Sequence, residues 1–572
     1  MIRTHQTHNT QVLENPIGHQ AGRVADSDVE AHLEPSMEVY RDARWQQSSR
    51  LKVPFFAGLA VICGVTAFIG AVPTRIYGHD IFVWLAGGWR VITGQRPHID
   101  FASPFGPFMF LISGLGLTIS HHTADGIGYG SAIMALLVGM WSYFLGRNRL
   151  TSAPQMILGF FLAALVAAPY PLGLSPFMSS HAMLYNRYGY ALIGIILLEV
   201  FEPARSLRGK QENGWVGGVS TGVALGLTLF LKASYFFVSL ILIGVISWLL
   251  RRLNRQRIFG IIAGFSLVAI CMLAYLRFDV SAMMADLRMA AGARASALKS
   301  PVGALLTHAS VLLGVMLFAI STTLFFSNRV PQWRGLKLII IGALLFFADI
   351  SLLISNAQFG DFPLTAVFAI LTLNEITEDH RSLPRTGSRS YRASLVALLS
   401  LGALLFIPQF TSDLAGLGYG AWRKYKPKNA VKVLRFTSQN LKPLLLYDAA
   451  DNPLAEGRLF TEYVNDGVAL LERETRPNET ILTMDATNPF PYAMGRRPPR
   501  GGHAAGWYPS TITLTYRPSD SRYFGDADIV MVPKRSSQGD RNWVVYRAYE
   551  AGLKQRYNLA AESSLWWMYR RK

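Results

Sequence analysis

Long apolar runs separated by short polar loops dominate the chain between residues 53 and 410. A helix needs about 20 residues to cross roughly 30 Å of hydrocarbon. Runs close to that length predict about eleven membrane-spanning helices, at 53–72, 127–145, 154–171, 187–201, 215–231, 233–250, 257–277, 303–326, 337–355, 359–376 and 392–409. A further apolar run at 107–120 is ambiguous, because counting it as a span would reverse the sidedness of every later loop.

The distribution of Lys and Arg decides how this run is read. If 107–120 does not cross, one side of the membrane holds about twice as many basic residues in its loops as the other side. The basic loops are 146–149, 202–210, 251–257, 328–337 and 375–392. Because basic loops mark the cytoplasmic face, we expect a cytoplasmic N-terminus and an outer C-terminus. The run at 107–120 is then a juxtamembrane or re-entrant helix within a first outer loop at 73–126.

The composition divides the chain into three parts. Residues 1–52 are polar and mixed in charge, without a signal peptide, and predict a disordered cytoplasmic tail. Residues 53–410 form the membrane domain. Residues 411–572 contain no spanning run, and their helix-like segment 464–475 and β-rich segments 481–485 and 527–533 predict a small α/β or α+β extracytoplasmic domain. The predicted fold class is therefore an all-α polytopic membrane protein with a small C-terminal mixed domain.

Overall composition supports this class. The chain has 572 residues, of which 51% are hydrophobic and 16% charged, and this excludes an ordinary soluble globular protein. Its net charge of +19 would suggest a nucleic-acid partner in a soluble protein, but basic clusters between apolar runs follow the positive-inside rule instead, and we expect no nucleic acid. Cys63 and Cys271 lie inside apolar runs without metal-ligand or redox spacing, so we expect neither a zinc site nor a disulfide framework.

Two carboxylates in the first outer loop are the strongest candidates for chemistry. Acidic residues at the membrane boundary are functional candidates by default. Asp80 precedes the helix-like IFVWLAGGWRVI, and it is a candidate general base for an incoming hydroxyl or an N-cap of that helix, two roles that are not exclusive. Asp100 follows the turn signal GQRPH, and it either takes part in catalysis or substrate positioning or forms a salt bridge or turn cap.

Four further polar residues are expected on the same outer face. His79 is a candidate ligand or a capping residue, and Asn186 is a candidate for substrate binding. Arg187 in YNRYGY holds a phosphate bidentately or stacks on its neighbouring tyrosines. Lys232 interrupts the apolar stretch GVALGLTLFLKASYFF and either binds a phosphate or snorkels to the interface. The glycine pairs at 87–88 and 217–218 indicate helix packing rather than phosphate loops.

The block GHDIFVWLAGGWRVITGQRPHIDFASPFGPFMFLI, with the later MLYNRYGYAL and GLTLFLKASYF, resembles bacterial GT-C glycosyltransferases of the dolichyl-phosphate-mannose mannosyltransferase and aminoarabinose-transferase type. The matching positions are Trp89, Arg90, Gly94, Pro97, Asp100, Phe101, Gly106 and Pro107. The specific pattern covers the first outer loop, and the architecture covers residues 53–410. Many relatives carry two adjacent acids in this loop, whereas here Asp80 follows His79, so the resemblance supplies no metal site and no cofactor.

The resemblance implies an inverting transferase of the bacterial inner membrane that moves a sugar from a polyprenyl-phosphate donor to a glycan, lipid or protein acceptor on the outer face. By matching position, Asp80 is the implied base. Charge and sidedness add Lys232 and Arg187 as candidates to stabilise the departing lipid phosphate. Two alternatives stay open: a transporter or flippase for lipid-linked glycans, which requires broken helices at the membrane midplane, and a noncatalytic scaffold, which leaves the acidic loop unexplained.

Overall fold

The computed structural model describes residues 34–201, 214–327, 332–381, 389–426, 433–447, 457–535 and 543–572. The chain divides into two compact units, Met1–Leu51 and Lys52–Lys572. Helix α2 (Glu34–Ile69) begins in the first unit, upstream of the apolar run at 53–72. Residues 1–33 of the expected tail, the basic loop 202–210 and parts of the loops 328–337 and 375–392 lie outside the described residues.

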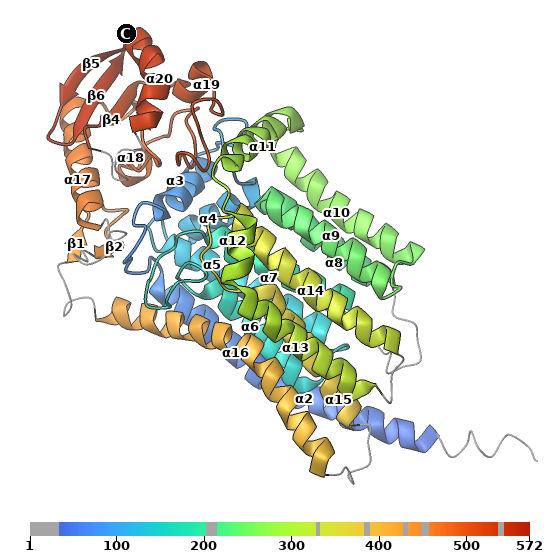
Figure 1. The fold of residues 1–572 in the computed structure, drawn as a ribbon. Helices are drawn as coiled ribbons and strands as arrows, with labels where there is room; N and C mark the ends of the chain where they lie inside the picture. Colours follow the sequence, from blue (N-terminus) through green and yellow to red (C-terminus); the bar gives the residue numbers. More distant parts are fainter. Residues whose placement is uncertain are drawn as a thin grey trace, which may run out of the picture. The chain divides into compact units, whose positions relative to one another are not determined.

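Helices occupy the apolar runs in the order the sequence predicts (Figure 1). They are α2, α5 (Gly126–Gly146), α6 (Ser152–Ala167), α7 (Leu184–Phe201), α8 (Gly214–Leu231), α9 (Ala233–Leu249), α10 (Arg255–Tyr275), α13 (Ala309–Phe326), α14 (Gln332–Ser355), α15 (Pro363–Arg381) and α16 (Arg389–Tyr425). Within the described part of the chain, seven helices are long and apolar enough to cross a membrane. The protein is therefore mostly helical and built as a multi-pass membrane protein, while the count of eleven spans stays a prediction.

Two segments differ from the predicted runs. The run 303–326 is divided at His308 into α12 (Pro301–Thr307) and α13. Helix α16 continues beyond the apolar run 392–409 as far as Tyr425. Its continuation contains polar residues, including Asp413, which is fully buried. The predicted run ended too early because polar residues lower the hydropathy even where they are buried.

Loops predicted on the outer face contact one another at one end of the helices. Backbone hydrogen bonds join them, from Arg75 N to Ser179 O (2.9 Å), from Phe359 N to Leu172 O (3.1 Å) and from Gly106 N to Leu231 O (3.0 Å). The loops predicted on the opposite face are likewise joined, by the ion pair Arg149–Glu199 (2.7 Å) and the hydrogen bond from Thr151 N to Asn374 (2.7 Å). The relative sidedness predicted from charge therefore agrees with these contacts.

Helix α4 (Pro107–Ile119) corresponds to the ambiguous run. Its 13 residues extend about 20 Å, short of the hydrocarbon thickness. Before its start, Gly106 contacts the turn between α8 and α9. After its end, His122 O accepts a hydrogen bond from Tyr492 of the C-terminal segment (2.8 Å). Both ends therefore contact segments predicted on the outer face, and that α4 does not cross stays a prediction.

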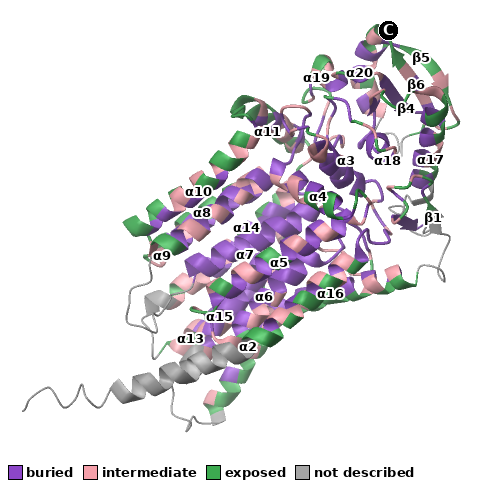
Figure 2. Cartoon of the chain, turned by 180° about the vertical axis from the view of Figure 1, so that it is seen from behind, coloured by how far each residue is buried: buried purple, intermediate pink, exposed green. Residues whose placement is uncertain are grey.

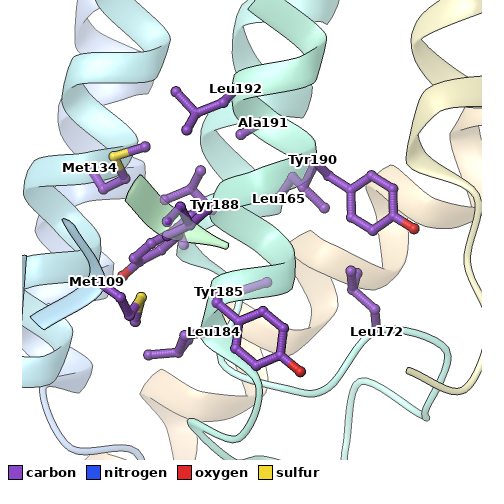
Figure 3. Packing of buried hydrophobic residues seen from close by; sticks show 14 of the residues in the cluster. Met109, Met134, Leu165, Leu172, Leu184, Tyr185, Tyr188, Tyr190, Ala191 and Leu192 are labelled. Carbon is purple, nitrogen blue, oxygen red and sulfur yellow. The ribbon is translucent and has the colours of Figure 1, made fainter. Parts of the chain in front are cut away.

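Helix α7 lies at the centre of the core. All its residues are buried, whereas α10 has exposed apolar side chains along its length (Figure 2). Tyr185 and Tyr190 project from one side of α7 and Tyr188 from the other (Figure 3). In a membrane, exposed apolar side chains contact lipid and need no protein cover.

Glycines allow the closest helix contacts, as predicted for both glycine pairs. A Cβ atom on Gly87 of helix α3 (Ile81–Ile92) would lie 2.2 Å from the ring of Phe110 on α4. A Cβ atom on Gly218 of α8 would lie 2.4 Å from Arg257 O on α10. Small residues let helix backbones approach in this way.

The C-terminal segment combines helices with a small sheet. Strands β1 (Val433–Arg435) and β2 (Leu445–Tyr447) pair antiparallel, and helix α17 (Gly457–Glu474) follows. The second sheet has the order β3-β4-β6-β5, from β3 (Ile481–Thr483), β4 (Ile529–Pro533), β5 (Tyr557–Glu562) and β6 (Trp566–Arg571). Strands β3 and β4 are parallel and the other pairs antiparallel. Short helices α18 (Phe490–Ala493) and α19 (Asp520–Phe524) and helix α20 (Trp543–Arg556) complete it.

Backbone pairing attaches this C-terminal segment to the first loop. Thr74 exchanges hydrogen bonds with the β2 strand, through Leu445 O (2.8 Å) and Tyr447 N (2.9 Å). Ala102 exchanges them with Gly502 O (3.1 Å) and Ala504 N (2.9 Å). The first loop, which carries the candidate carboxylates, is therefore held between the helices and the C-terminal segment.

Candidate functional site

Asp80 and His79 lie together where α3 begins. Asp80 occupies the N-cap position, but its side chain makes no capping hydrogen bond. Instead, its Oδ1 lies 2.9 Å from His79 Nε2, and both residues are 5% exposed. The ring of Phe460 on α17 packs against His79, with centroids 6.3 Å apart. The carboxylate therefore pairs with His79 and does not cap the helix.

Tyr185 connects Asp80 with Lys232. The Asp80 carboxylate is close enough for its charge to act on the Tyr185 hydroxyl. The Lys232 ammonium lies over the Tyr185 ring at 4.0 Å and over the Phe105 ring at 5.5 Å. Trp84, one turn into α3, packs against both rings. The structure therefore brings Asp80, His79 and Lys232 into one neighbourhood.

Lys232 lies in the turn between α8 and α9, at the N-cap position of α9. It is half-buried, and within the described residues no carboxylate pairs with its ammonium. Burial lowers the pKa of Lys232 well below its usual value, and the nearby charge of Arg294 lowers it further. A bound anion would offset both effects, because an opposite charge favours the charged form of an amine.

Two further cations join this group, and they were not among the predicted site residues. Arg294, on helix α11 (Val280–Ala295), lies close enough to Lys232 and Lys299 for its charge to act on both. Its Nη2 donates to Ile354 O (3.1 Å), while its buried Nε has no hydrogen-bond partner in the described structure. Lys299 lies over the Phe359 ring at 5.5 Å. Their sequence signal was only a positive charge in a predicted outer loop.

The structure does not place Arg187 in this group. Its Nη1 pairs with Asp413 (2.8 Å) and also donates to Leu165 O (2.8 Å), while its Nε donates to Tyr170 O (2.8 Å). Its guanidinium stacks on the ring of Tyr170, at 4.3 Å, rather than on the tyrosines that neighbour it in sequence. The charge expected to hold a phosphate is therefore already neutralised by a buried carboxylate.

Asn186 is likewise engaged in packing. Its Oδ1 accepts from the Tyr235 hydroxyl (2.9 Å), and its Nδ2 donates to Ala357 O (2.9 Å). The side chain is 1% exposed. It fixes α7 to α9 and to the loop before α15, next to the site rather than in it.

Asp100 shapes the loop. Its Oδ2 accepts from Arg96 N (2.7 Å), its Oδ1 lies 3.5 Å from Arg500 Nε, and its carbonyl oxygen accepts from Gly501 N (2.6 Å). These contacts close the turn and attach it to the C-terminal segment. They correspond to the salt-bridge and turn-cap alternative for this residue.

The arrangement combines one carboxylate, aromatic rings and three cations. A carboxylate such as that of Asp80 can accept a proton from a hydroxyl. Cations without carboxylate partners can neutralise a phosphate that becomes more negative as it leaves. Among the described residues, no group of three or more His, Cys, Asp or Glu side chains is placed to hold a metal ion.

Comparisons with known proteins give a likeness in structure. No family model and no curated protein sequence matches the chain. The structure is similar to that of ArnT from Cupriavidus metallidurans bound to undecaprenyl phosphate, with a TM-score of 0.45, 12% identity and coverage of 90% of this chain and 97% of that one.

Two other solved structures are similar as well. One is an oligosaccharyltransferase from Archaeoglobus fulgidus, with a TM-score of 0.41, 11% identity and coverage of 84% of this chain and 69% of that one. The other is the mycobacterial arabinofuranosyltransferase AftD, with a TM-score of 0.38, 12% identity and coverage of 90% of this chain and 40% of that one. All three of these proteins are GT-C glycosyltransferases, the type that the first loop resembles.

Proposed function

We propose that the protein is a membrane glycosyltransferase that moves a sugar from a polyprenyl-phosphate donor to an acceptor hydroxyl on the outer face of the membrane. The observation that supports this proposal is that Asp80 and Lys232 both act on Tyr185, while Arg294 lies near Lys232 and Lys299. Within the described structure, none of these three cations pairs with a carboxylate. A carboxylate and a set of unneutralised cations are the two elements that proton removal and phosphate departure require.

In the proposed reaction, the acceptor oxygen attacks the anomeric carbon of the donor sugar. Its proton passes to the Asp80 carboxylate, and the bond from the anomeric carbon to the phosphate oxygen breaks. The electron pair of that bond goes to the phosphate, which leaves as the polyprenyl phosphate. One direct displacement inverts the anomeric configuration.

The cations contribute by binding the phosphate more strongly as its charge increases. Lys232 and Lys299 act as compact charges, and Arg294 offers two hydrogen bonds in one plane. The rings of Tyr185 and Phe105 hold the Lys232 ammonium by cation–π contact. Aromatic rings keep the ammonium in place without neutralising it, and this leaves its charge for the ligand.

A binding experiment tests the anion site. The purified full chain in detergent micelles is titrated with undecaprenyl phosphate. Lys232→Met and Arg294→Gln are each expected to weaken binding by about tenfold or more, because a charge-assisted hydrogen bond contributes about 1.5–3 kcal/mol.

Lys424→Met is the matched control. Lys424 belongs to the same end of the helices but pairs with Asp125 (2.8 Å), so its removal is expected to leave the affinity unchanged. Equal affinity in wild type, Lys232→Met and Arg294→Gln would contradict the proposed site.

A transporter for lipid-linked glycans would need helices interrupted at the membrane midplane. The interruptions at Lys232 and His308 lie instead beside the outer loops, next to Tyr185 and Phe362. The geometry therefore favours the transferase.

A further inference from the structure

Helix α11, which carries Arg294, has few internal anchors. Of its 16 residues, Met283, Asp286 and Ala293 are buried, and the others are partly or fully exposed. Two apolar side chains, one of them an alanine, bury little surface. The position of α11 must therefore depend strongly on the third buried residue, Asp286.

Asp286 is a fully buried carboxylate with three hydrogen-bond donors. Its Oδ2 accepts from Ser103 N (3.0 Å) and lies 3.0 Å from His98 Nδ1, and both of these residues belong to the first loop. Its Oδ1 pairs with Arg522 Nη1 (2.6 Å) from α19 of the C-terminal segment. Arg522 Nη2 also donates to His98 O (2.6 Å). The Asp286 carboxylate thus connects α11 with the first loop and with the C-terminal segment.

A second contact joins the C-terminal segment to α11 closer to Arg294. A Cβ atom on Gly292 would lie 2.4 Å from the ring of Tyr516, so the ring rests directly on the helix backbone. Gly292 precedes Arg294 by two residues. The C-terminal segment therefore contacts α11 at two separate points, one of them beside the site.

We infer that the C-terminal segment positions Arg294 for the phosphate through the Arg522–Asp286 pair, which makes Asp286 a positioning residue. The inference rests on the proposed function, because it assigns α11 the task of presenting a phosphate-binding cation. Asp286 and Arg294 are eight residues apart, or about 12 Å along the helix axis. A helix transmits a tilt at one end to the other, since its backbone hydrogen bonds keep it rigid. Loss of the Arg522–Asp286 pair therefore displaces the Arg294 guanidinium without removing it.

The test measures undecaprenyl phosphate binding to the full chain in micelles. Asp286→Asn and Arg522→Gln are each expected to weaken binding about threefold to tenfold, as a charge-assisted contact is lost in part. Arg522→Lys, which keeps the charge, is expected to retain most of the affinity. The matched control is Arg517→Gln, because Arg517 has similar exposure and pairs with Asp520 inside the C-terminal segment (2.8 Å). This control is expected to bind as the wild type does.

The decisive readout is the comparison with Arg294→Gln. If Asp286 acts through Arg294, then Asp286→Asn costs less than about twofold once Arg294 is already absent. The inference is overturned if Asp286→Asn weakens binding equally in the wild-type and the Arg294→Gln background. It is also overturned if Asp286→Asn does not weaken binding in the wild-type background. Should Asp286→Asn fail to fold, the same comparison is made with Arg522→Gln, whose side chain is 29% exposed.

The two proposals fail in different ways. A wild-type protein that does not bind undecaprenyl phosphate overturns the proposed function and this inference together. If wild type binds and Arg294→Gln weakens binding, but both Asp286→Asn and Arg522→Gln bind normally, the proposed function stands and the positioning role is refuted.

Discussion

Replacing Arg187 by glutamine is expected to destabilise the protein rather than to weaken its binding of phosphate. The side chain is 2% exposed, and it pairs with Asp413 while donating to the carbonyl oxygens of Leu165 and Tyr170. Its loss leaves the Asp413 carboxylate, which is fully buried, without a countercharge. Breaking a buried ion pair on one side costs about 3–5 kcal/mol.

Removal of both charges should cost much less. In Arg187→Met/Asp413→Leu no buried charge is left unpaired, and replacing a whole buried pair by apolar residues is often neutral. We therefore expect the double variant to recover most of the stability that Arg187→Gln loses. The exposed pair Arg473–Glu474 supplies the control, because Arg473→Gln removes a surface contact of little energetic weight.

Unfolding in detergent micelles by added dodecyl sulfate measures these differences, with undecaprenyl phosphate binding measured on the same preparations. A structural role for Arg187 is excluded if Arg187→Gln unfolds at the same denaturant fraction as wild type but loses its affinity for undecaprenyl phosphate. Arg187 would then hold the phosphate, as its charge alone suggests.

Three further results are expected. Gly222→Ala should lower stability by about 1–3 kcal/mol, because its Cβ would lie 2.1 Å from Ile261 O. Gly244→Ala is the control, because its Cβ would have no atom within 4 Å, and it should leave stability unchanged. Equal unfolding midpoints for the two variants would argue against tight packing of α8 on α10. Burial lowers the pKa of His503 to about 4, so its contribution to stability is present above about pH 6.5 and is lost as the pH falls toward 4. Unfolding midpoints at pH 7.5 and 5 should show this loss, and His503→Gln should reduce it; an unchanged pH profile in the variant would contradict the assignment. Asp100→Asn should reduce sugar transfer by less than about fivefold, since it removes one long ion pair with the exposed Arg500 and keeps the turn; complete loss of transfer would place Asp100 in the reaction.

Sequence reasoning located the helices well because their signal is local. Apolar runs correspond to helices throughout the described residues, and the charge asymmetry indicated that 107–120 does not cross. The hydropathy pattern did not reveal the division at His308, where α12 ends and α13 begins, because the residues before and after His308 are apolar. It also ended α16 too early, since hydropathy falls at polar residues even when they are buried, as Asp413 is.

The candidate site was only partly visible in the sequence. Asp80 pairs with His79, and both Asp80 and Lys232 act on Tyr185, whereas their role in one site stays a prediction. Arg294 and Lys299 had no distinguishing signal, because only folding shows which outer cations lie near Lys232. The reverse holds for Arg187, whose partner Asp413 is 226 residues away. Nothing local in a sequence shows that a charge is already neutralised by a distant residue.

The C-terminal segment shows the same division between local and distant information. The helix-like segment and the two β-rich segments correspond to α17, β3 and β4. The parallel pairing of β3 with β4 and the pairing of Thr74 with β2 join segments that are far apart in the chain. Such contacts depend on the folded arrangement, and they explain how the first loop is held.

The most direct test of the central proposal is sugar transfer by Asp80→Asn. The assay supplies lipid-linked sugars and acceptors that are both extracted from the host membrane. The release of polyprenyl phosphate from the lipid-linked sugars is then measured. We expect the variant to fold and to bind undecaprenyl phosphate as the wild type does, while transfer falls by about 100-fold to 10,000-fold, because no general base is left to take the acceptor proton. Transfer at the wild-type rate by a folded Asp80→Asn protein would contradict the account.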